Sequence, residues 1–180
     1  FLGVLVDDSR SMTIADKDGK PRSDFVRQQL IPKSPLFEEL SKRFVLRPIR
    51  FSSSADRAAN LADLQYAGTA SRIGPALERA RDELSGLPLA GLVLVSDGAD
   101  TTDSALDESL ASLKARQIPV FTVGLGQEHF AHDIQITRVE TPRSTLKGTS
   151  LSVDIVVSQT GYAGATVPLP IGPGLHPLWR

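Results

Sequence analysis

The chain has 180 residues, of which 41% are hydrophobic and 23% are charged, and its formal net charge is −1. This balance gives no basic surface for nucleic acid and no polybasic segment for a membrane. The absence of cysteine excludes disulfides, thiolate metal sites and a cysteine nucleophile. No run of about 18 apolar residues occurs, so we expect no direct membrane insertion by this chain.

The first part of the chain alternates apolar runs with segments of helical periodicity. Residues 2–6 form an apolar run typical of a central parallel strand. Ser23 is expected to cap a helix that ends at Leu30. Another helix is expected from Ser34–Pro35 onward, because proline is favoured at the first helical position. A second strand is expected over 44–51, and a short edge strand or a loop over 61–66.

The same alternation continues to residue 126. A helix with apolar residues at helical spacing is expected over 73–84, a buried strand over 89–95, a helix over 106–113 and a strand over 118–123. Strands and helices that alternate in this way favour an α/β fold with a doubly wound, mostly parallel sheet flanked by helices. Periodicity alone leaves the order of the strands open.

The pattern changes near Gln127. Residues 134–139 and 151–157 alternate with period two and no helix lies between them, which predicts the start of a truncated β-sandwich segment over 127–167. Residues 168–180 are rich in proline and glycine, so we expect a poorly ordered tail. Phe1 already belongs to an apolar run, and we therefore expect the chain to be a fragment of a longer protein.

Polar residues gather in three loops of the predicted α/β domain. Asp7, Ser9 and Ser11 follow the first strand, Thr69 precedes the third helix, and Asp97 follows the third strand. The carboxyl ends of parallel strands meet at one edge of a sheet, so we expect the three loops to converge there. Two carboxylates and three hydroxyls are hard oxygen donors, which favour Mg²⁺ or Mn²⁺, with Ca²⁺ as an alternative.

These motifs resemble the metal-ion-dependent adhesion site of von Willebrand factor A domains. The resemblance covers residues 1–126 and fills all five metal-associated positions: Asp7, Ser9, Ser11, Thr69 and Asp97. It implies that the serines and the threonine coordinate the ion directly or nearly so, and that the aspartates often act through water. It also implies an open coordination position for an Asp or Glu carboxylate of a protein partner.

A narrower resemblance is to bacterial membrane proteins in which an A domain precedes an immunoglobulin-like segment and a glutamine-amidotransferase-like domain. It rests on residues 6–12, 95–100 and 118–124. It implies that 127–167 begins the immunoglobulin-like part, and that this chain is a soluble fragment on the extracytoplasmic side. It also leaves an alternative function open, as a structural domain of a membrane-anchored enzyme whose amidotransferase-like chemistry lies outside this chain.

Enzyme classes that use a similar fold lack their motifs here. An aspartyl phosphotransferase would want a second aspartate where Ser9 stands, and a dinucleotide-binding domain would want Gly-x-Gly-x-x-Gly after the first strand. A serine hydrolase would want a Gly-x-Ser-x-Gly elbow. We therefore expect no catalytic residues, no nucleic-acid partner, and a metal-dependent protein-interaction module.

Overall fold

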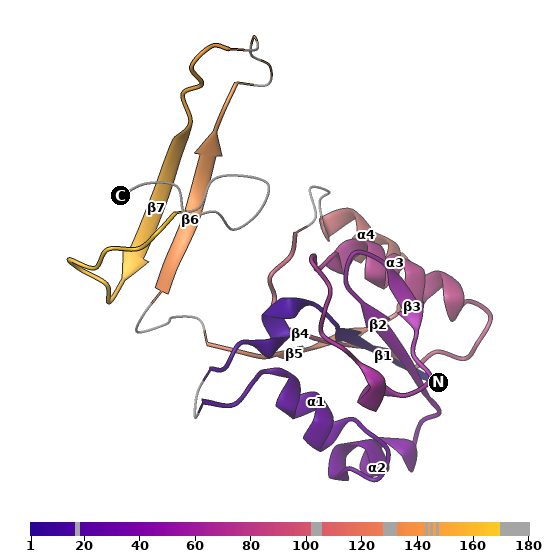
Figure 1. Cartoon of the computed structure of the whole chain (residues 1–180). Coiled ribbons are helices and arrows are strands. Elements are labelled where there is room, and N and C mark those ends of the chain that lie inside the picture. Colours follow the sequence, from indigo (N-terminus) through magenta and orange to yellow (C-terminus); the bar gives the residue numbers. More distant parts are fainter. Residues whose placement is uncertain are drawn as a thin grey trace. The chain divides into compact units, whose positions relative to one another are not determined.

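The computed structural model describes residues 1–16, 19–101, 106–127, 133–142, 144, 146 and 148–169. The chain divides into two compact units, Phe1–Gln127 and Glu128–Arg180. The first unit has alternating helices and strands, and the second has a two-stranded sheet (Figure 1).

The first unit is built on a five-stranded sheet with the order β3-β2-β1-β4-β5. The three strands β2 (Leu46–Phe51), β1 (Leu2–Asp7) and β4 (Gly91–Ser96) form its centre, and β5 (Val120–Gly124) continues the parallel arrangement at one edge. The other edge is the short antiparallel strand β3 (Ala55–Arg57). The predicted α/β fold with a mostly parallel sheet is confirmed, and the strand order is new information.

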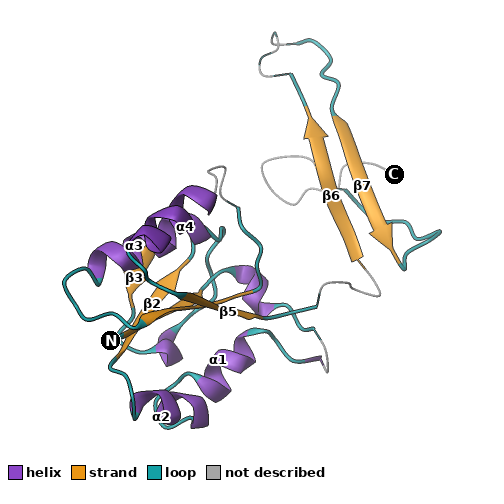
Figure 2. Cartoon of the chain, turned by 180° about the vertical axis from the view of Figure 1, so that it is seen from behind, coloured by secondary structure: helices purple, strands orange, loops and turns teal. Residues whose placement is uncertain are grey.

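Helices cover both faces of this sheet (Figure 2). On one face, α3 (Ile73–Glu83) and α4 (Leu106–Ala115) pack on a core that includes Leu5. On the other, α1 (Ser23–Gln29) and α2 (Pro35–Ser41) contribute to a core that includes Val4 and Val6. Successive residues of β1 point to opposite faces, so one buried strand serves both cores.

Two local predictions differ from the structure. Ser23 is the first residue of α1 and does not cap it. The segment 61–66 contains the 3₁₀ helix η3 (Leu61–Asp63), whose capping residue Asn60 accepts a hydrogen bond from the backbone N–H of Ala62 at 3.0 Å. Residues 64–66 form no regular element, in agreement with the loop alternative, and the edge strand lies earlier, at β3. Asparagine favours such a turn because its side chain mimics a backbone acceptor.

The second unit contains the antiparallel pair β6 (Asp133–Glu140) and β7 (Asp154–Thr160). A bulge between Ile136 and Arg138 shifts the register, so that Ile136 and Val139 lie on the same face of the ribbon. Both side chains are about half exposed, at 53% and 54%. The two strands are observed, whereas their assignment to an immunoglobulin-like sandwich stays a prediction.

The predicted tail lies largely outside the described residues, because the description ends at Leu169. In the part of the chain that is described, none of the helices combines the length and the apolar character needed to span a bilayer.

The packing of the helices on the sheet can be tested by comparing a buried leucine with an exposed one. Leu77 on α3 is 1% exposed, whereas Leu110 on α4 is 38% exposed. We expect Leu77→Ala to lower the free energy of unfolding by about 2–5 kcal/mol, because it leaves a cavity, and Leu110→Ala to lower it by less than about 1 kcal/mol. Urea denaturation followed by circular dichroism measures both, and equal losses would contradict the arrangement.

Candidate metal site

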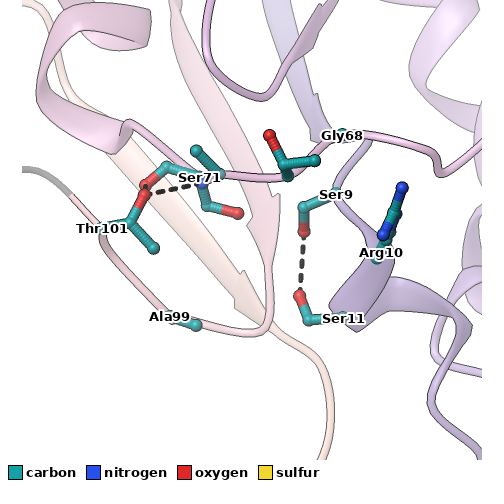
Figure 3. Close-up of a pocket in the computed structure, with 9 residues that line it drawn as sticks. Ser9, Arg10, Ser11, Gly68, Ser71, Ala99 and Thr101 are labelled. Carbon is teal, nitrogen blue, oxygen red and sulfur yellow. Dashed lines mark hydrogen bonds between the residues drawn. The ribbon is translucent and has the colours of Figure 1, made fainter. Parts of the chain in front are cut away.

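The loop after β1 turns sharply into the 3₁₀ helix η1 (Arg10–Thr13). The turn brings the hydroxyl oxygens of Ser9 and Ser11 within 2.8 Å of each other (Figure 3). Ser9 caps η1 in extended backbone geometry, but its side chain makes no capping hydrogen bond. Its hydroxyl therefore pairs with the side chain of Ser11 and not with a backbone N–H of the helix.

The segment that carries Thr69 is joined to this loop by backbone hydrogen bonds. The N–H of Gly68 donates to the carbonyl of Asp8 at 3.0 Å, and the N–H of Arg10 donates to the carbonyl of Gly68 at 2.9 Å. A Cβ atom at position 68 would lie 2.4 Å from the Cβ of Ser52, so only glycine allows this approach. Thr69, the next residue, is exposed beside the two serines.

Asp8 binds the segment before Thr69 from its buried side. Its carboxylate accepts a hydrogen bond of 2.6 Å from the backbone N–H of Tyr66, whose φ of +51° is uncommon for a residue with a side chain. Asp8 is 9% exposed. Its role in this structure is therefore to anchor the loop that carries Thr69.

Asp7 lies beneath the serines and is fully buried, with 0% exposure. Its carboxylate accepts hydrogen bonds from the N–H of Ser9 at 2.9 Å, from the hydroxyl of Ser96 at 2.8 Å, and from the hydroxyl of Ser71 at 3.0 and 3.1 Å. Burial raises the pKa of Asp7 above its usual value, although these hydrogen bonds act in the opposite direction. The carboxylate thus joins the three loops at one point.

Asp97, at the end of β4, is held differently. One of its oxygens accepts a 2.6 Å hydrogen bond from the guanidinium of Arg22, and the other accepts from the N–H of Ala99 at 3.1 Å. Arg22 also binds Asp16, and the hydrogen bond to Asp16 is the largest cause of the raised pKa of Arg22; the pairing with Asp97 also raises this pKa, whereas burial lowers it. The side chain of Asp97 is only 2% exposed.

A pocket of about 230 Å³ opens where the three loops meet. The three predicted hydroxyl ligands are among its lining residues, whereas Asp7 and Asp97 are not. The complete lining consists of Ser9, Arg10, Ser11, Gly68, Thr69, Ala70, Ser71, Ala99 and Thr101.

The structure therefore brings the predicted residues to one edge but in two layers. Ser9, Ser11 and Thr69 line the pocket, and Asp7 and Asp97 lie behind it with their oxygens already hydrogen-bonded. Within the described residues, no group of three or more histidines, cysteines, aspartates or glutamates gathers to hold an ion.

Sequence reasoning missed several residues of this edge. Ser71 stands two positions after Thr69 and Ser96 directly before Asp97, so their placement in the motif loops was a usable signal. Thr101 exchanges hydrogen bonds with the backbone of Ser71, its side chain donating to the carbonyl at 3.0 Å (Figure 3). No sequence motif marks the segment around Arg22, so its place at this edge could not be predicted.

No protein-family model and no curated protein matches this chain. Solved structures that match include proximal thread matrix protein 1 (PTMP1) from the mussel byssus, in two crystal structures with TM-scores of 0.49 and 0.50. Each is 19% identical to this chain and covers 68% of it, whereas this chain spans 37% and 36% of theirs. At this identity the likeness concerns the fold alone.

The buried Asp7 predicts a pH-dependent stability. Because its pKa is raised in the folded state, the ionised carboxylate reduces stability at neutral pH, and this penalty shrinks as pH falls toward the usual value of 3.8. In EDTA at pH 7 we expect Asp7→Asn to be more stable than the wild type, and the advantage to decline toward pH 4. Urea denaturation at several pH values measures it.

The control for this prediction is Asp63→Asn, which removes a carboxylate from an exposed position on η3. A wild type at least as stable as Asp7→Asn at pH 7, or an advantage that grows as pH falls, would contradict the prediction.

Proposed function

We propose that residues 1–127 form a metal-dependent protein-interaction module of the von Willebrand factor A type. In this proposal Mg²⁺ or Mn²⁺ binds at the pocket on the loop edge, and a protein partner supplies an Asp or Glu carboxylate. The observation that carries the proposal is the group of hydroxyls, Ser9, Ser11 and Thr69, that lines one pocket above the buried Asp7.

The two serines support this proposal by their spacing. Neighbouring ligands of an octahedral Mg²⁺, each about 2.1 Å from the ion, lie about 3 Å apart. The hydroxyl oxygens of Ser9 and Ser11 are 2.8 Å apart. The pair therefore fits two adjacent coordination positions with little movement.

The two aspartates support it by their charge. Asp7 and Asp97 lie behind the pocket, and hydrogen bonds already hold their oxygens. In this arrangement they would act through water and through their negative charge. Neutral hydroxyls leave a bound cation strongly electropositive, and the chemistry that it would supply is the attraction of an anionic oxygen.

The rim of the pocket supports a carboxylate partner in particular. Arg10 and Thr69 are both exposed and line the same pocket. An exposed guanidinium attracts carboxylates and orients them through paired N–H groups. An acidic side chain that approaches this edge would meet Arg10 as well as the cation.

The first test is the thermal stability of the chain with and without metal. A ligand that binds only the folded state stabilises it by about 2.7 kcal/mol at a hundredfold excess over its Kd. We expect millimolar Mg²⁺ or Mn²⁺ to raise the melting temperature above that in EDTA, and Ser11→Ala to reduce the rise. Differential scanning calorimetry measures both.

Ser85→Ala is the matched control, since Ser85 lies beyond the C-terminal end of α3, is not among the pocket-lining residues, and donates its hydroxyl to the carbonyl of Asp82. It should leave the metal-dependent rise unchanged. Identical melting curves in EDTA and in metal would reject the metal site and favour the alternative of a structural domain within a larger membrane-anchored enzyme.

The second test concerns the partner. We expect peptides selected from a random displayed library in Mg²⁺ to contain an Asp or Glu whose amide replacement abolishes binding. Thr69→Ala should weaken peptide binding by about tenfold, equivalent to about 1.4 kcal/mol, and metal affinity by less. Calorimetric titration measures both affinities. Peptides that bind equally well in EDTA, or without an acidic residue, would reject the carboxylate mechanism.

A further inference from the structure

Arg22 lies just before α1 and is buried between two carboxylates. Its Nε and Nη2 atoms donate to the two oxygens of Asp16 at 2.6 and 3.2 Å, while Nη1 donates to Oδ2 of Asp97 at 2.6 Å. The side chains of Arg22, Asp16 and Asp97 are 8%, 7% and 2% exposed. Water therefore screens these interactions weakly.

The surrounding backbone fixes the position of this guanidinium. Its Nη1 also donates to the carbonyl of Ser11 at 3.4 Å, which is part of the predicted metal loop. On the other side, a Cβ atom at Gly126 would lie 2.9 Å from Nε of Arg22 and 3.0 Å from Oδ2 of Asp16. Arg22 is thus enclosed by the loop after β1, the end of β4 and the segment that follows β5.

The guanidinium of Arg22 would compete with a divalent cation for one carboxylate. It holds the same Asp97 that the sequence motif assigns to the metal site, and the hydrogen bond from Ala99 takes the other oxygen of that carboxylate. A cation at the pocket would be repelled by the guanidinium and would compete with it for the charge of Asp97.

We propose that Arg22 is an internal cation that sets the affinity of this edge for divalent ions by competing for Asp97. The inference rests on the metal site proposed above and adds its regulation. Asp16 makes the competition reversible: because it binds Arg22 through two N–H groups, Arg22 can release Asp97 and remain paired. A buried guanidinium without that second carboxylate would be costly to release.

The test compares Arg22 with an arginine that lies away from the pocket. Arg22→Gln and Arg43→Gln remove the same charge, but Arg43 is exposed just after α2 and does not line the pocket, whereas Arg22 holds Asp97. We expect Arg22→Gln to tighten Mn²⁺ and Mg²⁺ binding by about tenfold or more, because it removes a buried positive charge and releases Asp97. Arg43→Gln should change the affinity by less than about threefold, because water and salt screen an exposed charge.

A second pair of variants changes the affinity in the opposite direction. Asp16→Asn removes the carboxylate that keeps Arg22 paired when it releases Asp97, so the metal should bind several-fold more weakly. Asp24→Asn, on α1, where the carboxylate pairs with Arg27 at 3.8 Å, is the control and should have little effect. If Arg22→Gln does not fold, the comparison of Asp16→Asn with Asp24→Asn still tests the proposal.

Calorimetric titration of the metal-free chain with MnCl₂ and MgCl₂ separates the outcomes. If Arg22→Gln binds metal no more tightly than the wild type, or no more tightly than Arg43→Gln, the inference is overturned while the metal site stands. The same holds if Asp16→Asn binds as tightly as the wild type. If no protein binds metal, both proposals fail. If Arg22→Gln binds and the wild type does not, the role of Arg22 is supported and the proposed function of the native chain is rejected.

Discussion

The buried carboxylate of Asp7 is the constraint on which the rest of the edge depends. A fully buried charge must be hydrogen-bonded, and the donors that satisfy it come from the loop after β1, the segment before α3 and the end of β4. Those donors are Ser9, Ser71 and Ser96. Three segments far apart in the sequence are thereby fixed around the Asp7 carboxylate. The hydroxyls of Ser9, Ser11 and Thr69 lie above it.

The same edge separates hydroxyls from charges. Neutral oxygens line the pocket, whereas the carboxylates lie behind it, one among hydrogen-bond donors and the other against Arg22. Such an arrangement keeps buried charges satisfied when no cation is present, which is the condition for a domain that folds without its ligand. In the function proposed above, the outer side of the pocket would take an anionic group from another molecule.

All of these interactions lie within Phe1–Gln127. The second unit contributes a ribbon whose bulge places Ile136 and Val139 on the same face. A two-stranded ribbon gains little stability by itself, because it buries little apolar surface. The stability of the candidate site is therefore a property of the five-stranded sheet and the helices on its two faces.

The sequence by itself determined the alternating elements, the parallel sheet and the five candidate residues, because hydrophobic periodicity and the Asp-x-Ser-x-Ser spacing are local properties. It also located the helix that begins at Pro35, since proline favours the first helical turn. Only the tertiary structure decided the strand order, the burial of Asp7 and the ion pair between Arg22 and Asp97, whose partners are 75 residues apart. These features arise from packing and long-range electrostatics, which depend on which segments meet in space and leave no periodic trace along the chain.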